Sequence, residues 1–209
     1  MIFRSTVFLC MSLVFSGQLL AEKKSPTWMF EFHAGLFEPE LSDWDQHYGN
    51  EKFPELGFSY AYRFLSVIDV GASIGYGKDR GTGQLLSNSA VAGSVEYQII
   101  PIEIFALLRG RVYENQWIVP YIGGGYTRFV YRQEIVGQSK AQGSVNGSHV
   151  RMGLQFLLDA LDQTAAQGMY RRWGVLNSYL YFDYKQTTAE VNDIALGGNS
   201  YKVGVMFEF

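Results

Sequence analysis

Apolar and polar residues alternate with a period of two along most of the chain. In residues 201–209, the odd positions read Tyr, Val, Val, Phe, Phe and the even positions read Lys, Gly, Met, Glu. Because successive side chains of a strand point to opposite faces, this alternation predicts a two-faced β-strand. The same pattern recurs in seven earlier stretches, at 28–36, 56–64, 68–77, about 100–112, 119–132, 150–158 and 176–185. The pattern predicts an all-β fold.

The connections between these predicted strands alternate in length. Long polar segments occupy residues 38–54, 78–92, 133–148 and 186–199, whereas the links at 65–66 and 113–118 are short. Residues 159–173 lose the period of two, which predicts a short helical or irregular connection. Long loops on one side and compact turns on the other are typical of outer-membrane barrels, whose turns face the periplasm. We therefore expect both termini in the periplasm and the four long segments as extracellular loops.

Charged residues and glycines share one face of the predicted strands, and aromatic and branched residues take the other. A soluble lipocalin-like barrel, which remains the alternative, would place its apolar face inside. About ten residues per strand is the length that crosses a bilayer at a steep tilt. Trp28, Trp117 and Trp173 all map to the short-turn end, where an interfacial aromatic girdle is expected. The sequence thus predicts an eight-stranded antiparallel transmembrane β-barrel with one short helical or irregular periplasmic connection.

Composition agrees with one-sided apolar strands. The chain of 209 residues is 47% hydrophobic and 16% aromatic, has 23 glycines, and has a mean hydropathy of −0.03, which is too polar for a helical membrane protein. Residues 1–21 resemble a secretory signal, with Arg4, an apolar core and a cleavage site after Ala21, so 22–209 is expected to be the barrel domain. An N-terminal membrane anchor is the alternative. Cys10, the only cysteine, lies in this segment, so the mature chain would have no thiol chemistry.

Charge excludes one class of partner. The chain has 17 basic and 20 acidic residues, a formal net charge of −3, and no basic patch in the sequence. Nucleic-acid binding depends on such a patch and is not expected.

The charged side chains of the polar strand face have mixed signs. An interior of eight strands is just wide enough for side chains to fill it, and buried charges must be paired. We expect a lumenal network of ion pairs that holds the barrel together and blocks free diffusion; a gated, narrow path is the alternative. The residues expected in the network are Glu31, His33, Arg63, Asp69, Glu103, Arg109, Arg111, Arg128, Arg132, Arg151, Asp183, Lys185, Lys202 and Glu208.

The sequence does not indicate a catalytic or metal site. Of the three histidines, His47 and His149 belong to the predicted loop regions, and His33 shares the polar face with Glu31. None stands in the His-x-Ser arrangement that lipid A deacylases of this size resemble. The acidic residues at 43, 45 and 51 are more typical of a solvated loop than of a cation site. We expect no catalytic residue, no metal and no cofactor.

The chain resembles the small outer-membrane β-barrels of Gram-negative bacteria, of the OmpA, OmpX and OmpW type, over nearly all of its mature length. The signal segment, the Val-Pro-Tyr-Ile-Gly-Gly-Gly stretch at 119–125 and the terminal strand carry this resemblance. It implies a location in the cell outer membrane, with outer-membrane lipid and the barrel-assembly machinery as partners. It also implies that Tyr201, Phe207 and Phe209 form the assembly signal which that machinery reads. The resemblance leaves the identity of an extracellular partner open.

Three functions fit this fold. We expect a non-enzymatic structural or surface-interaction protein with a plugged lumen. The first alternative is an OmpW-like narrow conduit for small hydrophobic molecules, with a pocket lined for instance by Leu85 and Leu86. The second alternative is a lipid-modifying outer-membrane enzyme.

Overall fold

The computed structural model describes residues 27–209 except 41–43, 45–50, 85–90, 114, 136–140, 192–193 and 196. The expected signal segment 1–21, Cys10, His47, Leu85 and Leu86 lie outside the described residues. The elements are β1 (Trp28–Pro39), β2 (Phe53–Phe64), β3 (Ile68–Gln84), β4 (Val91–Arg109), β5 (Ile118–Ile135), β6 (Ala141–Leu157), η1 (Leu158–Ala160), α3 (Gln163–Trp173), β7 (Asn177–Val191), β8 (Ile194–Ala195) and β9 (Gly198–Glu208).

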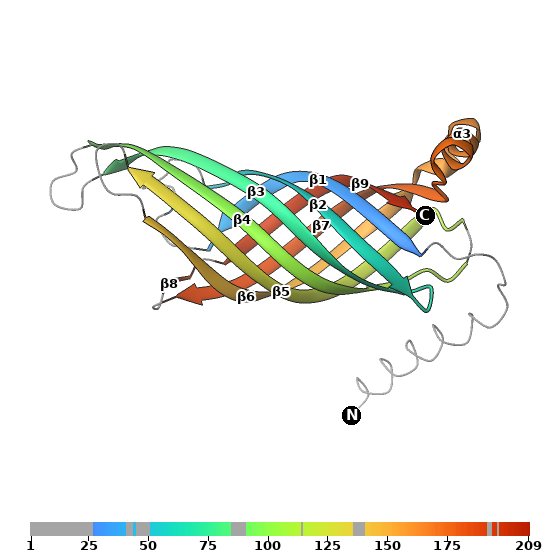
Figure 1. Cartoon of the computed structure of the whole chain (residues 1–209), viewed down its shortest axis with the longest axis horizontal. Helices are drawn as coiled ribbons and strands as arrows, with labels where there is room; N and C mark the ends of the chain where they lie inside the picture. Colours follow the sequence, from blue (N-terminus) through green and yellow to red (C-terminus); the bar gives the residue numbers. More distant parts are fainter. Residues whose placement is uncertain are drawn as a thin grey trace, which may run out of the picture.

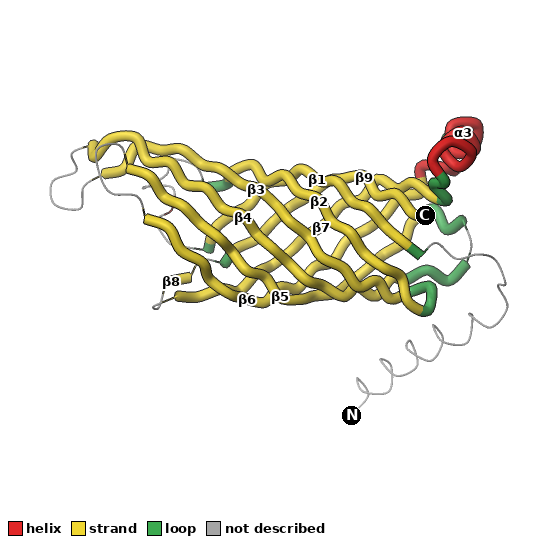
Figure 2. Tube along the Cα trace, in the orientation of Figure 1, coloured by secondary structure: helices red, strands yellow, loops and turns green. Residues whose placement is uncertain are grey.

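Eight of these strands close into an antiparallel barrel (Figure 1 and Figure 2). Each strand from β1 to β7 pairs with the next, and β9 pairs with both β7 and β1, while β8 adds two residues to the end of β7. The two ends of the described chain meet at this closure, where Thr27 N donates to Phe209 O over 2.7 Å. The predicted eight-stranded antiparallel barrel with one short helical connection is confirmed.

The period of two decides which side chains face inward. On β1, Met29, Glu31 and His33 are buried, whereas Phe32 and Leu36 are exposed on the outer face. β4 follows the same rule. Its inward positions include Pro101 and Phe105, so the two residues that blur the sequence pattern are lumenal, and its outward positions 100, 102, 104, 106 and 108 are all apolar.

The outer face carries a band of exposed apolar side chains. β1, β3 and β4 each present five successive apolar outward positions, at 28–36, 68–76 and 100–108. Nine residues of tilted strand match the thickness of a bilayer core. An apolar surface of this extent costs free energy in water and none in lipid, because every strand finds its backbone partners within the closed sheet. This band is the part of the barrel that crosses the membrane.

The strands extend further at one end than the sequence pattern predicts. We call the end where β1 leads to β2, β3 to β4, β5 to β6 and β7 to β9 the loop end, and the opposite end the turn end. Most of the predicted loops 78–92, 133–148 and 186–199 is strand in the structure. The prediction was wrong there because ladder hydrogen bonds need no apolar outward residues beyond the membrane. Several inward positions of these extensions are apolar, as Val95, Tyr97 and Val145 show, whereas Asp79 and Thr187 are buried polar residues.

The turn end has compact connections. Leu65 and Ser66, with φ of 48° and 62°, form a tight turn between β2 and β3 of the kind that suits the twist of a hairpin. Between β6 and β7, η1 and α3 fill the segment predicted to be helical or irregular. Asp162 caps α3 by accepting from the backbone N–H of Thr164 and Ala165, both at 2.9 Å. None of the α3 residues is buried, and the helix lies outside the turn-end rim (Figure 1).

No helix in the described part of the chain is both long and apolar enough to cross a membrane.

Glycines on the inward face make room for tyrosine rings on the neighbouring strand. Gly204 of β9 pairs with Tyr181 of β7, and a Cβ on Gly204 would lie 2.7 Å from that ring. Gly153 of β6 and Tyr121 of β5 have the same relationship, at 2.5 Å from the hydroxyl. The glycines that share a face with the charges therefore let the lumen hold aromatic rings as well.

Candidate functional site

Acidic and basic side chains face one another in the lumen. Among the described residues they come from every barrel strand except β5, and all but Arg111 are buried. The seven acids are Glu31, Glu55, Asp69, Asp79, Glu103, Asp183 and Glu208, and the six bases are Arg63, Arg109, Arg111, Arg151, Lys185 and Lys202.

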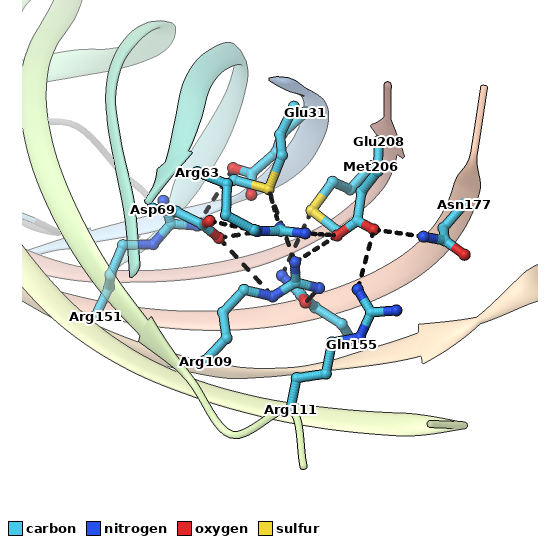
Figure 3. Close-up of polar contacts among 11 residues, drawn as sticks. Glu31, Arg63, Asp69, Arg109, Arg111, Arg151, Gln155, Asn177, Met206 and Glu208 are labelled. Carbon is cyan, nitrogen blue, oxygen red and sulfur yellow. Dashed lines mark hydrogen bonds and ion pairs between the residues drawn. The ribbon is translucent and has the colours of Figure 1, made fainter. Parts of the chain in front are cut away.

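Glu208 is the centre of the layer nearest the turn end (Figure 3). Its Oε1 accepts from Arg109 and lies 2.8 Å from Arg63 Nη1, and its Oε2 accepts from Asn177 over 2.7 Å. Arg111 Nη1 lies 3.8 Å from Oε2. This carboxylate of β9 thereby connects β2, β4 and β7 across the lumen.

Asp69 completes this layer from β3. It accepts from Arg63 Nε over 2.7 Å and lies 3.8 Å from Arg109 Nε. Arg109 also donates to Gln155 Oε1, and its guanidinium lies 5.4 Å from the centre of the Tyr179 ring. Arg63 and Arg109 thus each contact two carboxylates, and buried charges are stable only when paired in this way.

A second layer surrounds Arg151 of β6. Arg151 forms a close ion pair with Asp183 and lies 3.6 Å from Glu31, while Tyr121 donates to Asp183 over 2.7 Å. The Arg151 guanidinium also lies over the Phe105 ring, 5.2 Å from its centre. The layer combines charge pairing with aromatic contact, which arginine provides better than lysine.

The third layer, in the middle of the barrel, contains two lysines. Lys185 of β7 donates to Glu103 of β4, and Lys202 of β9 lies 3.0 Å from Glu55 of β2. His33 Nε2 lies 3.5 Å from Lys202 Nζ. Unlike Arg151 and Asp183 of the adjacent strands β6 and β7, these two pairs join strands that are not neighbours, so they tie separate parts of the wall together.

The loop end of the interior is apolar. Side chains of β1, β2, β4, β5, β6 and β7 form one buried cluster together with Trp44, whose indole donates to Asp79 over 3.2 Å. Trp44 packs edge-on against Tyr97 at 4.9 Å between ring centres. The cluster consists of Phe37, Trp44, Phe53, Val95, Tyr97, Ile99, Phe129, Val145 and Ala189.

Burial is nearly complete in the charged layers. Asp69, Arg109 and Glu208 each have an exposed fraction of 0%, and Lys185 has 1%. No space that admits a water molecule therefore touches the first three side chains. In this setting, ion pairs supply structure, because a reacting group would need access as well as a partner.

Two of the predicted lumen residues lie elsewhere. Arg128 and Arg132 are exposed on the outer face of β5, because Thr127 and Phe129 take the inward positions beside them. The expectation of a lumenal position was wrong for both, since β5 extends beyond the apolar band, where charged outward residues are in contact with water or headgroups. The other twelve predicted residues point into the lumen or to its turn-end mouth.

The sequence interpretation missed several lumenal residues. Glu55 lies between the predicted loop 38–54 and the predicted strand 56–64 and was left out of both, although it shares its parity with Ser59 and Arg63 of the same strand. Gln155 has the parity of Arg151, and its role as a partner of Arg109 depends on a contact between distant strands. If the predicted strand had been extended by one or two residues, Glu55 would have been assigned to the lumen. No local feature of the sequence indicates the contact between Gln155 and Arg109.

The two histidines in the described part of the chain, His33 and His149, are buried in the lumen. His149 lies on β6 rather than in a loop, and its Nδ1 is 2.7 Å from Thr127 Oγ1, with exposed fractions of 3% and 0% for the two residues. This hydroxyl and imidazole have no access to a substrate. In the described part of the chain, no group of three or more His, Cys, Asp or Glu side chains could hold a metal ion.

Aromatic residues mark both edges of the apolar band. Trp28 stacks on Tyr60 at 5.3 Å, and Trp117 and Trp173 are exposed at the same turn end. At the loop end, tyrosines take the last apolar outward positions on β3, β7 and β9, and on β5 a tyrosine precedes the first charged outward position. The sequence interpretation missed this girdle. Its residues are Tyr76, Tyr126, Tyr184 and Tyr201.

Lys52 and Asp159, which both lie outside the band, have shifted pKa values. Lys52 contacts Glu38 over 3.1 Å, and its hydrogen bond to this carboxylate raises the pKa of Lys52. At the turn end, burial raises the pKa of Asp159, which accepts from Ser178 N over 3.1 Å. Both residues anchor a connection to the rim of the barrel.

The closed antiparallel sheet, its lipid-facing apolar band and its polar interior define the class: this chain is a transmembrane β-barrel of the small outer-membrane type. No protein-family model matches its sequence, and no curated protein matches it.

Solved structures have the same fold. The outer membrane protein OprG from Pseudomonas aeruginosa is similar with a TM-score of 0.64 and 10% identity, over 89% of this chain and 97% of that one. Neisserial surface protein A is similar with a TM-score of 0.55 and 14% identity, over 87% and 96%. At these identities the likeness concerns the fold alone. It confirms the expected resemblance to small Gram-negative outer-membrane barrels at that level.

Proposed function

We propose that this protein is a non-conducting, non-enzymatic barrel of the outer membrane, with a structural or surface-interaction role. The observation that carries the proposal is the complete burial of the ion-paired layers, above all Arg109, Asp69 and Glu208. A continuous water path along the axis would expose these side chains. Several pairs join strands that are not neighbours, as Arg109 with Glu208 and Lys185 with Glu103 do, which supports a mechanical role.

Conductance in planar bilayers tests the closed lumen. We expect the refolded wild-type barrel to give no steady openings in a bilayer where a larger porin, added as a reference, conducts. Arg128→Gln, which alters only the outer face, is the matched control and stays equally silent. Steady wild-type openings that disappear in Arg109→Gln and persist in Arg128→Gln would overturn the proposal.

The rim of the loop end is the surface offered to partners outside the cell. The strand extensions of β3 to β7 lift this rim beyond the apolar band. A deletion strain is expected to lose surface binding or envelope integrity. An intact envelope combined with slower uptake of hydrophobic molecules would favour the conduit function instead.

One observation favours a conduit for small hydrophobic molecules as the second candidate. The ladder between β3 and β4 stops after Ile74 and Ile102 and resumes at Gly77 and Ile99. Pro101 lies in the gap and has no N–H to donate. The apolar cluster at the loop end lies beside this gap, since Ile99 belongs to both. The two strands keep the same register on both sides of the gap, and a Cβ on Gly75 would lie 2.9 Å from Pro101 Cγ, so a sideways exit into the membrane would require the strands to separate there.

Uptake of a fluorescent hydrophobic probe separates the two candidates. If the conduit operates, Pro101→Val restores the missing N–H and slows uptake, whereas Pro120→Val on the outer face of β5 leaves it unchanged. Equal uptake in the wild type, both variants and a strain without the protein would exclude the conduit. Boiled and unboiled samples on a detergent gel show that each variant has folded.

The remaining roles are also proposals. Tyr201, Phe207 and Phe209 on the lipid-facing side of the closing strand would be the residues that the barrel-assembly machinery reads, and Trp28, Trp117 and Trp173 would hold the turn end at the membrane interface. Slower assembly of Phe209→Ala than of Phe182→Ala, an exposed phenylalanine on β7, would support the first role. Unchanged lipid A mass spectra with and without the protein would support the absence of enzymatic activity.

A further inference from the structure

Four basic side chains stand on the outer face directly beyond the apolar band at the loop end. Lys78 and Arg80 belong to β3, and Arg128 and Arg132 belong to β5. We call them the cationic strip. On both strands a tyrosine girdle residue, Tyr76 or Tyr126, precedes the first of them. The strip therefore lies at the level where a bilayer changes from acyl chains to headgroups.

Acidic neighbours neutralise the strip only in part. Lys78 and Arg80 share one carboxylate, Glu96, at 2.6 and 2.9 Å. Arg132 Nη2 lies 3.5 Å from Glu134, and the Arg132 side chain is 48% exposed. Arg128 has no acidic partner within ion-pair distance among the described residues. Two acids face four bases, which leaves positive charge for an external anion.

Arg128 extends toward the loop end. Its Nη2 donates to Ser144 Oγ over 3.1 Å, and Ser144 is paired with Val130, one outward position further from the membrane centre. An arginine beside an apolar band adopts this direction to bring its charge to the headgroup level. The guanidinium groups of Arg128 and Arg132 thus lie on the two sides of Val130.

A groove of about 620 Å³ lies along the same positions. Val130 and Ile100 give it an apolar floor, and Arg128, Arg132 and Ser144 give it polar edges. An apolar floor continuous with the membrane band and a cationic rim fit an amphiphile whose acyl chains point down and whose anionic headgroup points up. The corresponding first outward positions on β6, β7 and β9 are neutral, namely Ser148, Gln186 and Asn199.

We propose that the cationic strip and its groove bind a phosphorylated glycolipid of the outer leaflet. Arginine pairs with phosphate through two parallel hydrogen bonds, which makes it the residue suited to this headgroup. Four residues of strand place Arg128 and Arg132 about 13 Å apart. A disaccharide with a phosphate at each end can meet both arginines, whereas a glycerophospholipid brings a single phosphate and meets one. The loop end faces the outer leaflet, where such glycolipids reside.

Binding is measured on the refolded barrel in detergent by native mass spectrometry. The probes are bisphosphorylated lipid A, its form with one phosphate removed, and phosphatidylglycerol. We expect the bisphosphorylated lipid to bind most tightly and the monophosphorylated form more weakly. Arg128→Gln with Arg132→Gln weakens the binding of the bisphosphorylated lipid at least roughly tenfold, and binding decreases as salt is raised. Lys52→Gln, on the opposite part of the rim, leaves it unchanged.

A gain of binding provides the second arm of the test. Glu96→Gln removes the acid that neutralises Lys78 and Arg80, so it is expected to tighten binding severalfold. Heat-modifiable mobility on a gel confirms that each variant has folded. Equal binding of all three lipids, binding of phosphatidylglycerol alone, or unchanged binding in the double arginine variant would each overturn the proposal.

Discussion

The charges inside the barrel and the charges of the cationic strip differ in what balances them. Inside, Glu208 contacts Arg63 and Arg109, and every side chain of this group is fully or almost fully buried. On the strip, Arg128 makes one hydrogen bond to a serine, and the Arg80 side chain is 67% exposed. The interior must neutralise its charges with its own residues, because no solvent reaches them.

The difference shows that the charges inside the barrel and those on its outer face serve different functions. Buried pairs connect strands across the lumen and fix its walls, while exposed bases at the membrane edge remain available to headgroups. The same residue type, arginine, thus serves stability in one place and recognition in the other. Substitutions on the two sides should therefore differ in the quantity that they change.

The largest expected effect is on the turn-end layer. Arg109→Leu leaves Glu208 and Asp69 with fewer partners inside the barrel, and breaking a buried pair in this way costs about 3–5 kcal/mol of unfolding free energy. Urea unfolding of the refolded barrel, followed by tryptophan fluorescence, measures this loss. The double variant with Glu208→Gln should lose less than the sum of the two single variants, because they act on one network. Additive losses would contradict the network.

A smaller loss of unfolding free energy is expected where a glycine of the interior makes room for a neighbouring ring. Gly204→Val places methyl groups against the Tyr181 ring, which lies 2.7 Å from a Cβ at this position. Overpacking of this kind costs typically about 1–3 kcal/mol. Gly168→Ala in α3, where a Cβ meets nothing within 4 Å, is the control. If Gly204→Val were as stable as the wild type, the lumen would be less tightly filled than the ring contacts indicate.

The smallest change in stability is expected on the outer face. Arg128→Gln removes an exposed charge with one hydrogen bond, so the unfolding free energy should stay within about 0.5 kcal/mol of the wild type. The same urea titration measures it, with Arg109→Leu alongside. A loss comparable to that of Arg109→Leu would show that the two regions do not differ as described.

Much of the fold follows from local pattern. The alternation at 28–36 and 201–209 assigns each residue to the lumen or the lipid, because a strand has only two faces. Glu31, Lys202 and Glu208 were therefore placed inside from the sequence. For Arg128 and Arg132, the alternation correctly showed that they share one face of the strand. The face was assigned wrongly, because a charged side chain was expected to point into the lumen.

The sequence alone determined that this protein is a barrel whose apolar face is outside, since a period of two and the position of its tryptophans are local properties. Only the tertiary structure decided which charges meet. Arg109 and Glu208 are 99 residues apart and Lys185 and Glu103 are 82 apart. Their contact depends on strand register and on the tilt at which the sheet closes. Those quantities belong to the whole barrel, because each is fixed only when β9 pairs with β1.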